Sequence, residues 1–236
     1  MKQIALDIRL VTGPTLANFF PGPNAAAHQH LLYWVGPIVE RRFSEIPRSP
    51  VPTYVWGRTG SGKSHLLKAV REALREQGES VGWLDASVYE PLDFNDNWTA
   101  VLMDDVHLYT ASQQHVAFNW FVNATIPRSG TPRPVVATGN LPPAELMLRE
   151  DLRTRLGWGH VFGLQVLSES ERRAVLRQTA DARGVFLGDE VMDFMLTRFS
   201  RDLGSLMNLL DQLDAYALQT QRAITIPLIK SMLENL

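Results

Sequence analysis

Gly57-Arg58-Thr59-Gly60-Ser61-Gly62-Lys63-Ser64 is the stretch that decides the fold of this 236-residue chain. It has the pattern G-x-x-x-x-G-K-[ST], in which glycines let backbone N–H groups turn inward around phosphate oxygens. The apolar run Thr53–Trp56 precedes it, and Ser64–Gln77 has a helical rhythm, so the loop joins a strand to a helix. The positive end of that helix points at the same anion. A chance match is the alternative, and the flanking elements argue against it.

The residue types in this loop predict a nucleotide with a magnesium ion. The ammonium of Lys63 reaches terminal phosphates, and the hydroxyl of Ser64 suits Mg²⁺. We therefore expect ADP or ATP with Mg²⁺ as the cofactors. The nucleotide contacts expected from this segment are Gly57, Thr59, Gly60, Ser61, Gly62, Lys63, Ser64 and His65.

A pair of acids follows a second apolar run. Val101–Met103 ends in Asp104 and Asp105. A phosphate loop of this kind is served by an acid at the end of a neighbouring strand, which holds magnesium through water. Asp104 is expected on the magnesium side, and Asp105 where a base would orient the attacking water. Two aspartates after apolar residues also fit a solvated strand end.

Strand-like and helical segments alternate up to about residue 165 and then give way to helices alone. The alternation predicts a parallel sheet covered on both faces. The domains expected are an N-terminal extension over residues 1–12, an α/β domain over 13–165 and a small all-helical domain over 166–236. A helix is expected over Ala25–Phe43, another after Asp105 through Val122, and Ser168 and Asp189 are expected as N-caps.

Composition excludes several classes of protein. There is no cysteine, which excludes disulfides and thiolate metal sites. No signal peptide or bilayer-spanning apolar run is visible, so a cytoplasmic protein without membrane contact is expected. The net charge is −2, which gives no sign of a basic DNA-binding face, so DNA is expected only as an indirect partner.

The chain resembles the DnaA family of AAA+ ATPases, and in particular its Hda branch, over nearly its whole length. The segments that carry the resemblance are Phe19–Asn24, the phosphate loop, Leu102–Asp105, Arg153–Gly159 and Arg222–Ile226. Leu210–Asp214 favours the Hda branch. This resemblance implies a three-layer α/β/α AAA+ domain followed by a helical lid.

The resemblance also implies roles for single residues. Phe19, Phe20 and Asn24 would lie in the segment that packs near the base. Asn140 would be sensor 1, the polar group that follows the fourth strand. Arg155 would be an arginine finger, which acts in trans on a nucleotide held by a neighbour. An ion pair with Asp151 or Glu150 is the alternative for Arg155.

One position departs from the family pattern. The family places the sensor 2 arginine in the lid, where this chain has Gly204. Arg201, one helical turn earlier, is the expected substitute. We therefore expect weak intrinsic ATPase activity.

The N-terminal segment Gln3–Ile8 resembles a short clamp-binding peptide, with Gln3 offering an amide and Leu6 and Ile8 filling an apolar pocket. An edge strand of the chain's own fold, or a frayed terminus, is the alternative.

The partners implied are DnaA, the sliding clamp of DNA polymerase III and, through the Arg155 face, a second copy of the chain. The function implied is regulation of replication initiation by promoting ATP hydrolysis in DnaA. The alternatives are an autonomous ATPase that loads or remodels a partner, and a non-catalytic DnaA-binding adaptor.

Overall fold

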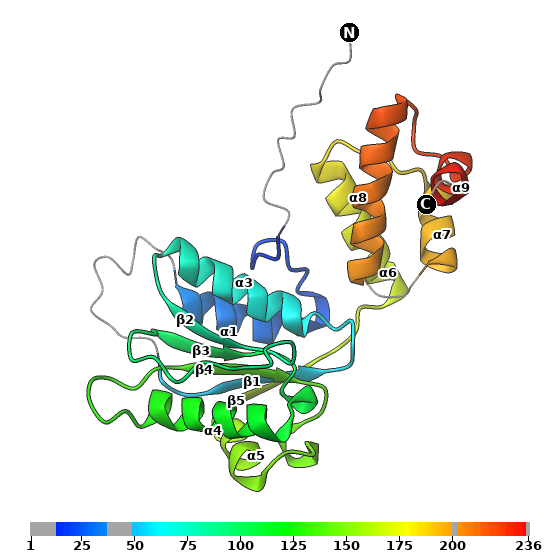
Figure 1. Cartoon of the computed structure of the whole chain (residues 1–236). Coiled ribbons are helices and arrows are strands. Elements are labelled where there is room, and N and C mark those ends of the chain that lie inside the picture. The colour runs from blue at the N-terminus through cyan, green and yellow to red at the C-terminus, as the bar shows by residue number, and fades with distance from the viewer. Residues whose placement is uncertain (1–12, 37–48, 200–202, 235–236) are drawn as a thin grey trace. The chain divides into compact units, whose positions relative to one another are not determined.

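The computed structural model describes residues 13–36, 49–199 and 203–234, and Figure 1 shows its elements. The chain forms two compact units. The larger runs up to Leu164 without the loop Arg58–Ser61, which groups with the helical unit that starts at Gln165.

The larger unit is built on a five-stranded sheet with the order β2-β3-β4-β1-β5, in which every neighbouring pair is parallel. The strands are β1 (Thr53–Gly57), β2 (Val81–Leu84), β3 (Ala100–Met103), β4 (Val135–Gly139) and β5 (His160–Leu164). Every residue of β3 and β4 is buried, as expected for parallel strands covered on both faces. The predicted α/β class with a parallel sheet is confirmed.

Helices cover both faces of this sheet (Figure 1). On one side lie α1 (Ala25–Val35) and α3 (Lys63–Glu76), and on the other α4 (Ala111–Thr125) and α5 (Glu150–Leu156). The 3-10 turns are η1 (Gly22–Asn24), η2 (Val106–Leu108) and η3 (Pro143–Glu145). Helix α3 buries one apolar side: Leu66, Leu67, Val70 and Leu74. Each such side chain stabilises the fold by about 1.5–3 kcal/mol, which fixes α3 behind the loop.

Two of the expected helices have different bounds. The first ends at Val35 rather than continuing to Phe43, because Gly36 takes a φ of 66° and its N–H bonds to the Leu32 carbonyl. Residues 37–48 lie outside the described part of the chain. The helix expected directly after Asp105 starts only at Ala111, since Thr110 and Gln113 form a capping box there.

The helical unit contains α6 (Glu169–Ala182), α7 (Asp189–Arg198), α8 (Leu203–Thr220) and α9 (Ile226–Glu234), packed around a core of their own. Ser168 caps α6, as predicted. The cap predicted at Asp189 is wrong: Gly188 is the N-cap, and the Asp189 carboxylate instead accepts a 2.6 Å hydrogen bond from Arg177 of α6.

The tight corner between α5 and β5 packs against Pro52, just before the start of β1. The N–H of His160 donates to the carbonyl of Pro52, and a Cβ on Gly159 would lie 1.9 Å from that oxygen. Only glycine lets the two backbones approach this closely.

None of the helices in the described parts of the chain has the length and apolar character needed to span a membrane.

Candidate functional site

The phosphate loop connects β1 to α3, as the sequence predicts. Its geometry relies on glycine at two positions with left-handed backbone, Gly60 at a φ of 82° and Gly62 at 96°. The Lys63 side chain is mostly buried. The Oγ of Ser61 is buried and finds no hydrogen-bond partner among the described residues. A buried hydroxyl at this place fits a phosphate oxygen that would complete its hydrogen bonding.

An N-terminal arm, residues 15–28, packs against this loop. A Cβ on Gly62 would lie 2.8 Å from Cε2 of Phe19, so the Phe19 ring covers the glycine directly. The same ring lies 5.3 Å from His28 and 5.6 Å from His65, measured between centroids. His65 also bonds through Nε2 to the carbonyl of Thr15 at 3.1 Å. Burial lowers the pKa of His65, so the imidazole is neutral at pH 7.

Ser64 and Asp104 meet at the carboxyl edge of the sheet. The Ser64 hydroxyl donates to Oδ1 of Asp104 at 3.0 Å, and the Thr138 hydroxyl donates to the same oxygen at 2.6 Å. Asp104 is buried, with 6% of its surface exposed. A serine hydroxyl and a carboxylate side by side are the oxygen ligands that Mg²⁺ prefers, directly or through water. The residues present therefore fit a Mg²⁺–nucleotide.

Asp105 has different contacts from Asp104 although the two are adjacent. Its backbone is left-handed, with a φ of 48°, and its N–H donates to the Thr138 hydroxyl at 2.8 Å. Its Oδ1 is buried without a hydrogen-bond partner among the described residues, 3.9 Å from Nδ1 of His107. Burial and then the charge of Asp104 raise the pKa of Asp105, against an opposing effect of Lys63. A basic, under-solvated carboxylate of this kind suits a group that accepts a hydrogen bond from water.

The remaining predicted nucleotide residues lie in or near the same region. Asn140 directly follows β4, and its buried Oδ1 has no hydrogen-bond partner within the described chain. Gly139 pairs with Trp56 in the register of β4 and β1, so Asn140 lies at the end of the strand beside the loop. Asn24 is buried, Phe20 is half-buried and Thr59 is exposed.

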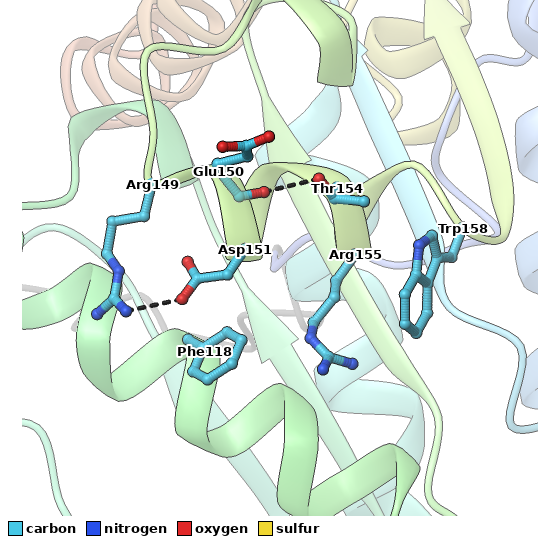
Figure 2. A pocket seen from close by; sticks show the side chains of 7 residues that line it. All are labelled: Phe118, Arg149, Glu150, Asp151, Thr154, Arg155 and Trp158. Carbon is cyan, nitrogen blue, oxygen red and sulfur yellow. Dashed lines mark hydrogen bonds and ion pairs between the residues drawn. The ribbon is translucent and has the colours of Figure 1, made fainter.

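Arg155 lies in an open pocket of about 680 Å³, on the side of the sheet covered by α4 and α5 (Figure 2). Its guanidinium carbon is 4.8 Å from the ring centroid of Trp158 and 5.2 Å from that of Phe118. Leu152 and Leu156 anchor α5 in the core beneath it. Within the described residues Arg155 has no ion pair, so the alternative pairing with Asp151 or Glu150 is not found, and Nη1 is buried without a hydrogen bond.

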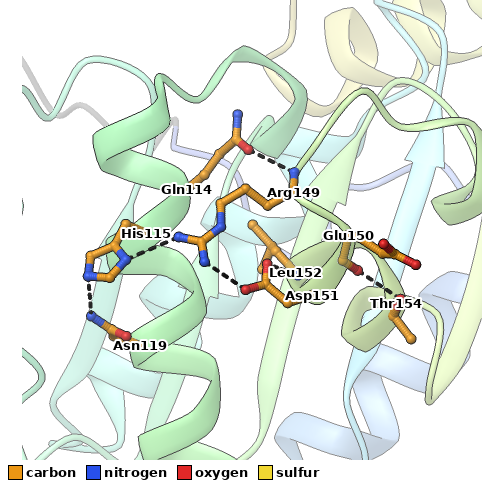
Figure 3. A network of polar contacts seen from close by, with 8 residues as sticks. All are labelled: Gln114, His115, Asn119, Arg149, Glu150, Asp151, Leu152 and Thr154. Atoms are coloured by element: carbon orange, nitrogen blue, oxygen red, sulfur yellow. Dashed lines mark hydrogen bonds and ion pairs between the residues drawn. The ribbon is translucent and has the colours of Figure 1, made fainter.

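A second arginine lines the pocket and has several contacts (Figure 3). Arg149 donates from Nη2 to Oδ2 of Asp151 at 2.7 Å, and its Nη1 lies 3.1 Å from Nδ1 of His115. Its backbone N–H donates to Oε1 of Gln114 at 3.0 Å, and its guanidinium lies 5.5 Å from the ring of Phe118.

Sequence reasoning missed several of these residues. Thr138 bonds to both aspartates and belongs to β4, whereas the sequence pointed only to Asn140, which follows that strand. Phe118 and Arg149 carried no signal at all, because they come together only when α4 packs beside α5. The predicted residues Gln3, Leu6, Ile8 and Arg201 lie outside the described residues. Gly204 is an exposed residue of α8.

The C-terminal unit matches a known protein family. Residues 169–233 match the family described as "Hda, lid domain". These residues run from the first residue of α6 to Leu233, one residue before the end of α9, so the match covers the helical unit almost completely.

Solved structures share the fold of the chain. It resembles domain III of the replication initiation protein DnaA from Thermotoga maritima, with a TM-score of 0.70, 19% identity, 94% of this chain covered and 95% of that chain. AMPPCP-bound DnaA from Aquifex aeolicus gives a TM-score of 0.62 and 19% identity over 84% of this chain and 64% of that one. The RuvB Holliday junction branch migration motor of Thermotoga maritima gives a TM-score of 0.62 and 14% identity, with 94% of this chain and 72% of that chain covered. The predicted three-layer domain with a helical lid is thereby confirmed.

Proposed function

We propose that this chain, whose helical unit matches the Hda lid family and whose fold matches DnaA, is a AAA+ protein of that family. In this proposal it regulates replication initiation by promoting ATP hydrolysis in a DnaA partner. It binds ADP or ATP with Mg²⁺ in its own phosphate loop and places Arg155 against a nucleotide held by the partner. The observation that carries the proposal is the state of Arg155: it lies in an open pocket against three aromatic rings, with no carboxylate paired to it among the described residues.

The resident nucleotide would be held by residues whose geometry is already suited to it. The loop N–H groups and Lys63 would hold the phosphates, while Ser64 and Asp104 would hold magnesium. Magnesium supplies charge neutralisation between the phosphates when bound. Thr138 keeps the Asp104 carboxylate oriented toward Ser64, and Phe19 keeps the loop in place at Gly62.

Arg155 would act on the phosphate of the neighbour. As water attacks the γ-phosphorus and the bond to the β–γ bridging oxygen breaks, negative charge accumulates on the departing oxygen. A planar guanidinium offers two parallel N–H donors to that charge, and it keeps its proton at any physiological pH. Stacking on Phe118 and Trp158 holds the guanidinium without neutralising it, since an aromatic face attracts a cation but carries no net charge.

The N-terminal peptide would bring the protein to its place of action. Gln3, Leu6 and Ile8 would bind the sliding clamp of DNA polymerase III in the cytoplasm, so that DNA is engaged only through the clamp. The match of the helical unit to the Hda lid family and of the fold to DnaA supports the replication setting. A second copy of the chain is the other neighbour that Arg155 could reach.

The test is the ATPase rate of DnaA in the presence of clamp loaded on DNA. Adding this protein should accelerate hydrolysis, and Gln3→Ala should weaken the effect by weakening clamp binding. Arg155→Ala should remove nearly all of it, because an arginine supplied in trans is worth about 10³–10⁵ in kcat. Arg153→Ala, on the same helix and without an ion pair among the described residues, is the matched control. An unchanged DnaA rate on adding the wild-type protein would refute the proposal.

An autonomous ATPase is the second candidate, and one observation favours it. Asp105 and Asn140 each keep a buried oxygen without a hydrogen-bond partner in the described chain, as groups that position a water would. An ATPase rate that the protein shows without DnaA, and that is lost in Asp105→Asn, would support this function. The absence of an arginine at Gly204 favours a slow rate.

A further inference from the structure

Asp151 and Arg155 stand four residues apart on α5, the spacing at which oppositely charged side chains pair on a helix. Such a pair would occupy the guanidinium of Arg155 with a carboxylate of its own chain. The pair is not formed: Arg155 has no ion pair among the described residues, and the Asp151 carboxylate is turned to Arg149 instead. Figure 2 shows Asp151 directed toward Arg149, with Arg155 beside Trp158.

We infer that Arg149 is a positioning residue, which holds the Asp151 carboxylate away from Arg155 and thereby keeps the Arg155 guanidinium available for a phosphate. Arg149 stands just before the first turn of α5, on the side of Asp151 opposite to Arg155 in the chain. The inference rests on the proposed function of Arg155 and adds the means by which that side chain is kept unpaired.

Arg149 is itself fixed from several directions, which lets it compete for Asp151. Helix α4 supplies three contacts: Gln114 to its backbone N–H, His115 to Nη1, and the Phe118 ring to the plane of the guanidinium. Arginine has no acceptor, so Nη1 of Arg149 donates to Nδ1 of His115. Nε2 faces the side-chain amide of Asn119 at 3.2 Å, which completes the chain of contacts in Figure 3.

Asp151 is also fixed at its other oxygen. Its Oδ1 accepts from the N–H of Leu152 at 2.8 Å, while Oδ2 accepts from Arg149. Both carboxylate oxygens therefore have a donor without Arg155. The two arginines share the Phe118 ring, at 5.5 Å for Arg149 and 5.2 Å for Arg155, so both guanidiniums are kept in one pocket although only one of them is paired.

The expected result of removing Arg149 follows from competition. In Arg149→Ala, Asp151 would turn to Arg155, and the fraction of unpaired Arg155 would fall. Stimulation of DnaA should drop about two- to fivefold, the factor by which an exposed ion pair of ordinary strength depletes a competent form. Arg149→Lys keeps a cation beside Asp151 and should stay near the wild-type value.

The decisive variant is the double change Arg149→Ala with Asp151→Asn. It removes the competing charge, so stimulation should return to the wild-type value, and Asp151→Asn alone should change little. A direct role for Arg149 at the partner's phosphate predicts that the double variant stays as weak as Arg149→Ala. A structural role for the Arg149–Asp151 pair predicts that Asp151→Asn alone is equally weak. Either outcome would overturn the inference.

A second measurement decides the inference without any partner. The Nε–Hε NMR signal of Arg155 should move in Arg149→Ala, as it does when a guanidinium gains a carboxylate, and should return in the double variant. An Arg155 signal that is the same in all variants would overturn the inference even if DnaA is not stimulated. If wild-type protein fails to stimulate DnaA while the signal behaves as described, the proposed function fails and the positioning role of Arg149 stands.

Discussion

The hydroxyl of Ser64 and the carboxylate of Asp104, 40 residues apart in the chain, are joined by a hydrogen bond of 3.0 Å. The bond links the first turn of the helix after the phosphate loop to the end of the neighbouring strand. It places two oxygen ligands where a nucleotide-bound magnesium ion would need them. The same carboxylate oxygen also accepts from Thr138, which fixes its direction.

Nucleotide affinity should depend on this pair only when magnesium is present. Ser64→Ala should weaken ADP binding in Mg²⁺ buffer and have a much smaller effect in EDTA, because the hydroxyl serves the ion rather than the phosphate. Lys63→Ala should weaken binding under both conditions by roughly 10- to 150-fold, since a hydrogen bond to a charged group contributes about 1.5–3 kcal/mol. Isothermal titration in the two buffers distinguishes these roles. Equal losses for Ser64→Ala with and without Mg²⁺ would contradict the assignment of its ligand role.

Asp105→Asn should stabilise the nucleotide-free protein at pH 7. Burial and the charge of Asp104 raise the pKa of Asp105, so the ionised carboxylate is less favourable in the folded state than in the unfolded chain. The folded state therefore holds its proton to higher pH, and wild-type stability falls as pH rises from the unfolded pKa through the folded one. Thermal unfolding of both proteins between pH 4 and 8 measures this. The Tm advantage of Asp105→Asn should grow across that window, and a lower Tm for the variant at pH 7 would refute the prediction.

Gly159→Ala should destabilise the protein strongly. The added Cβ would lie 1.9 Å from the Pro52 carbonyl, a backbone atom that cannot move without disturbing the start of β1. We expect a loss of about 1–3 kcal/mol or more, as for an overpacked core, and a fall in Tm of at least several degrees. Gly157→Ala is the matched control, because its nearest contacts lie at 3.5 Å and its φ is −87°. Equal melting temperatures for the two variants would show that the corner can relax.

Ser168→Ala should weaken the helical lid. The Ser168 hydroxyl accepts from the N–H of Glu171, and the Glu171 carboxylate accepts from the N–H of Ser168. Loss of an N-cap costs about 1 kcal/mol of stability. Ser168→Asp should preserve most of this stability, because an aspartate side chain can also accept the hydrogen bond at the N-cap. Hydrogen exchange of the amides in α6 is the appropriate measurement, since the loss is local to this unit. Unchanged protection at the start of α6 would show that the cap contributes little.

The sequence predicts that the phosphate loop and Asp104 lie together, because the residues that indicate this are local in the chain. Gly57–Ser64 and Asp104–Asp105 are contiguous segments whose residue types have few other uses, and the parallel sheet brings their ends together. The ends of helices are harder to predict from the sequence, because competing contacts decide them. Asp189 bonds to Arg177 instead of capping α7, and the left-handed backbone of Gly36 ends α1.

The surroundings of Arg155 could not be predicted in the same way. Arg149 and His115 are 34 residues apart, and their contact depends on how α4 and α5 pack across the second face of the sheet. No periodicity or motif contains that information. The motif around Arg155 could identify the side chain, but not whether it is paired.

The packing of Phe19 on Gly62 links the conformation of the phosphate loop to that of the arm over residues 15–28. Thr15 and Phe19 belong to an arm that continues the N-terminal segment, and they hold the first turns around Lys63 and His65 through a ring and a carbonyl. A tether works in both directions: a ligand that favours one arrangement of the loop favours the matching arrangement of the arm by the same factor. Thermodynamic reciprocity therefore couples occupancy of the loop to the packing of the arm at Thr15 and Phe19.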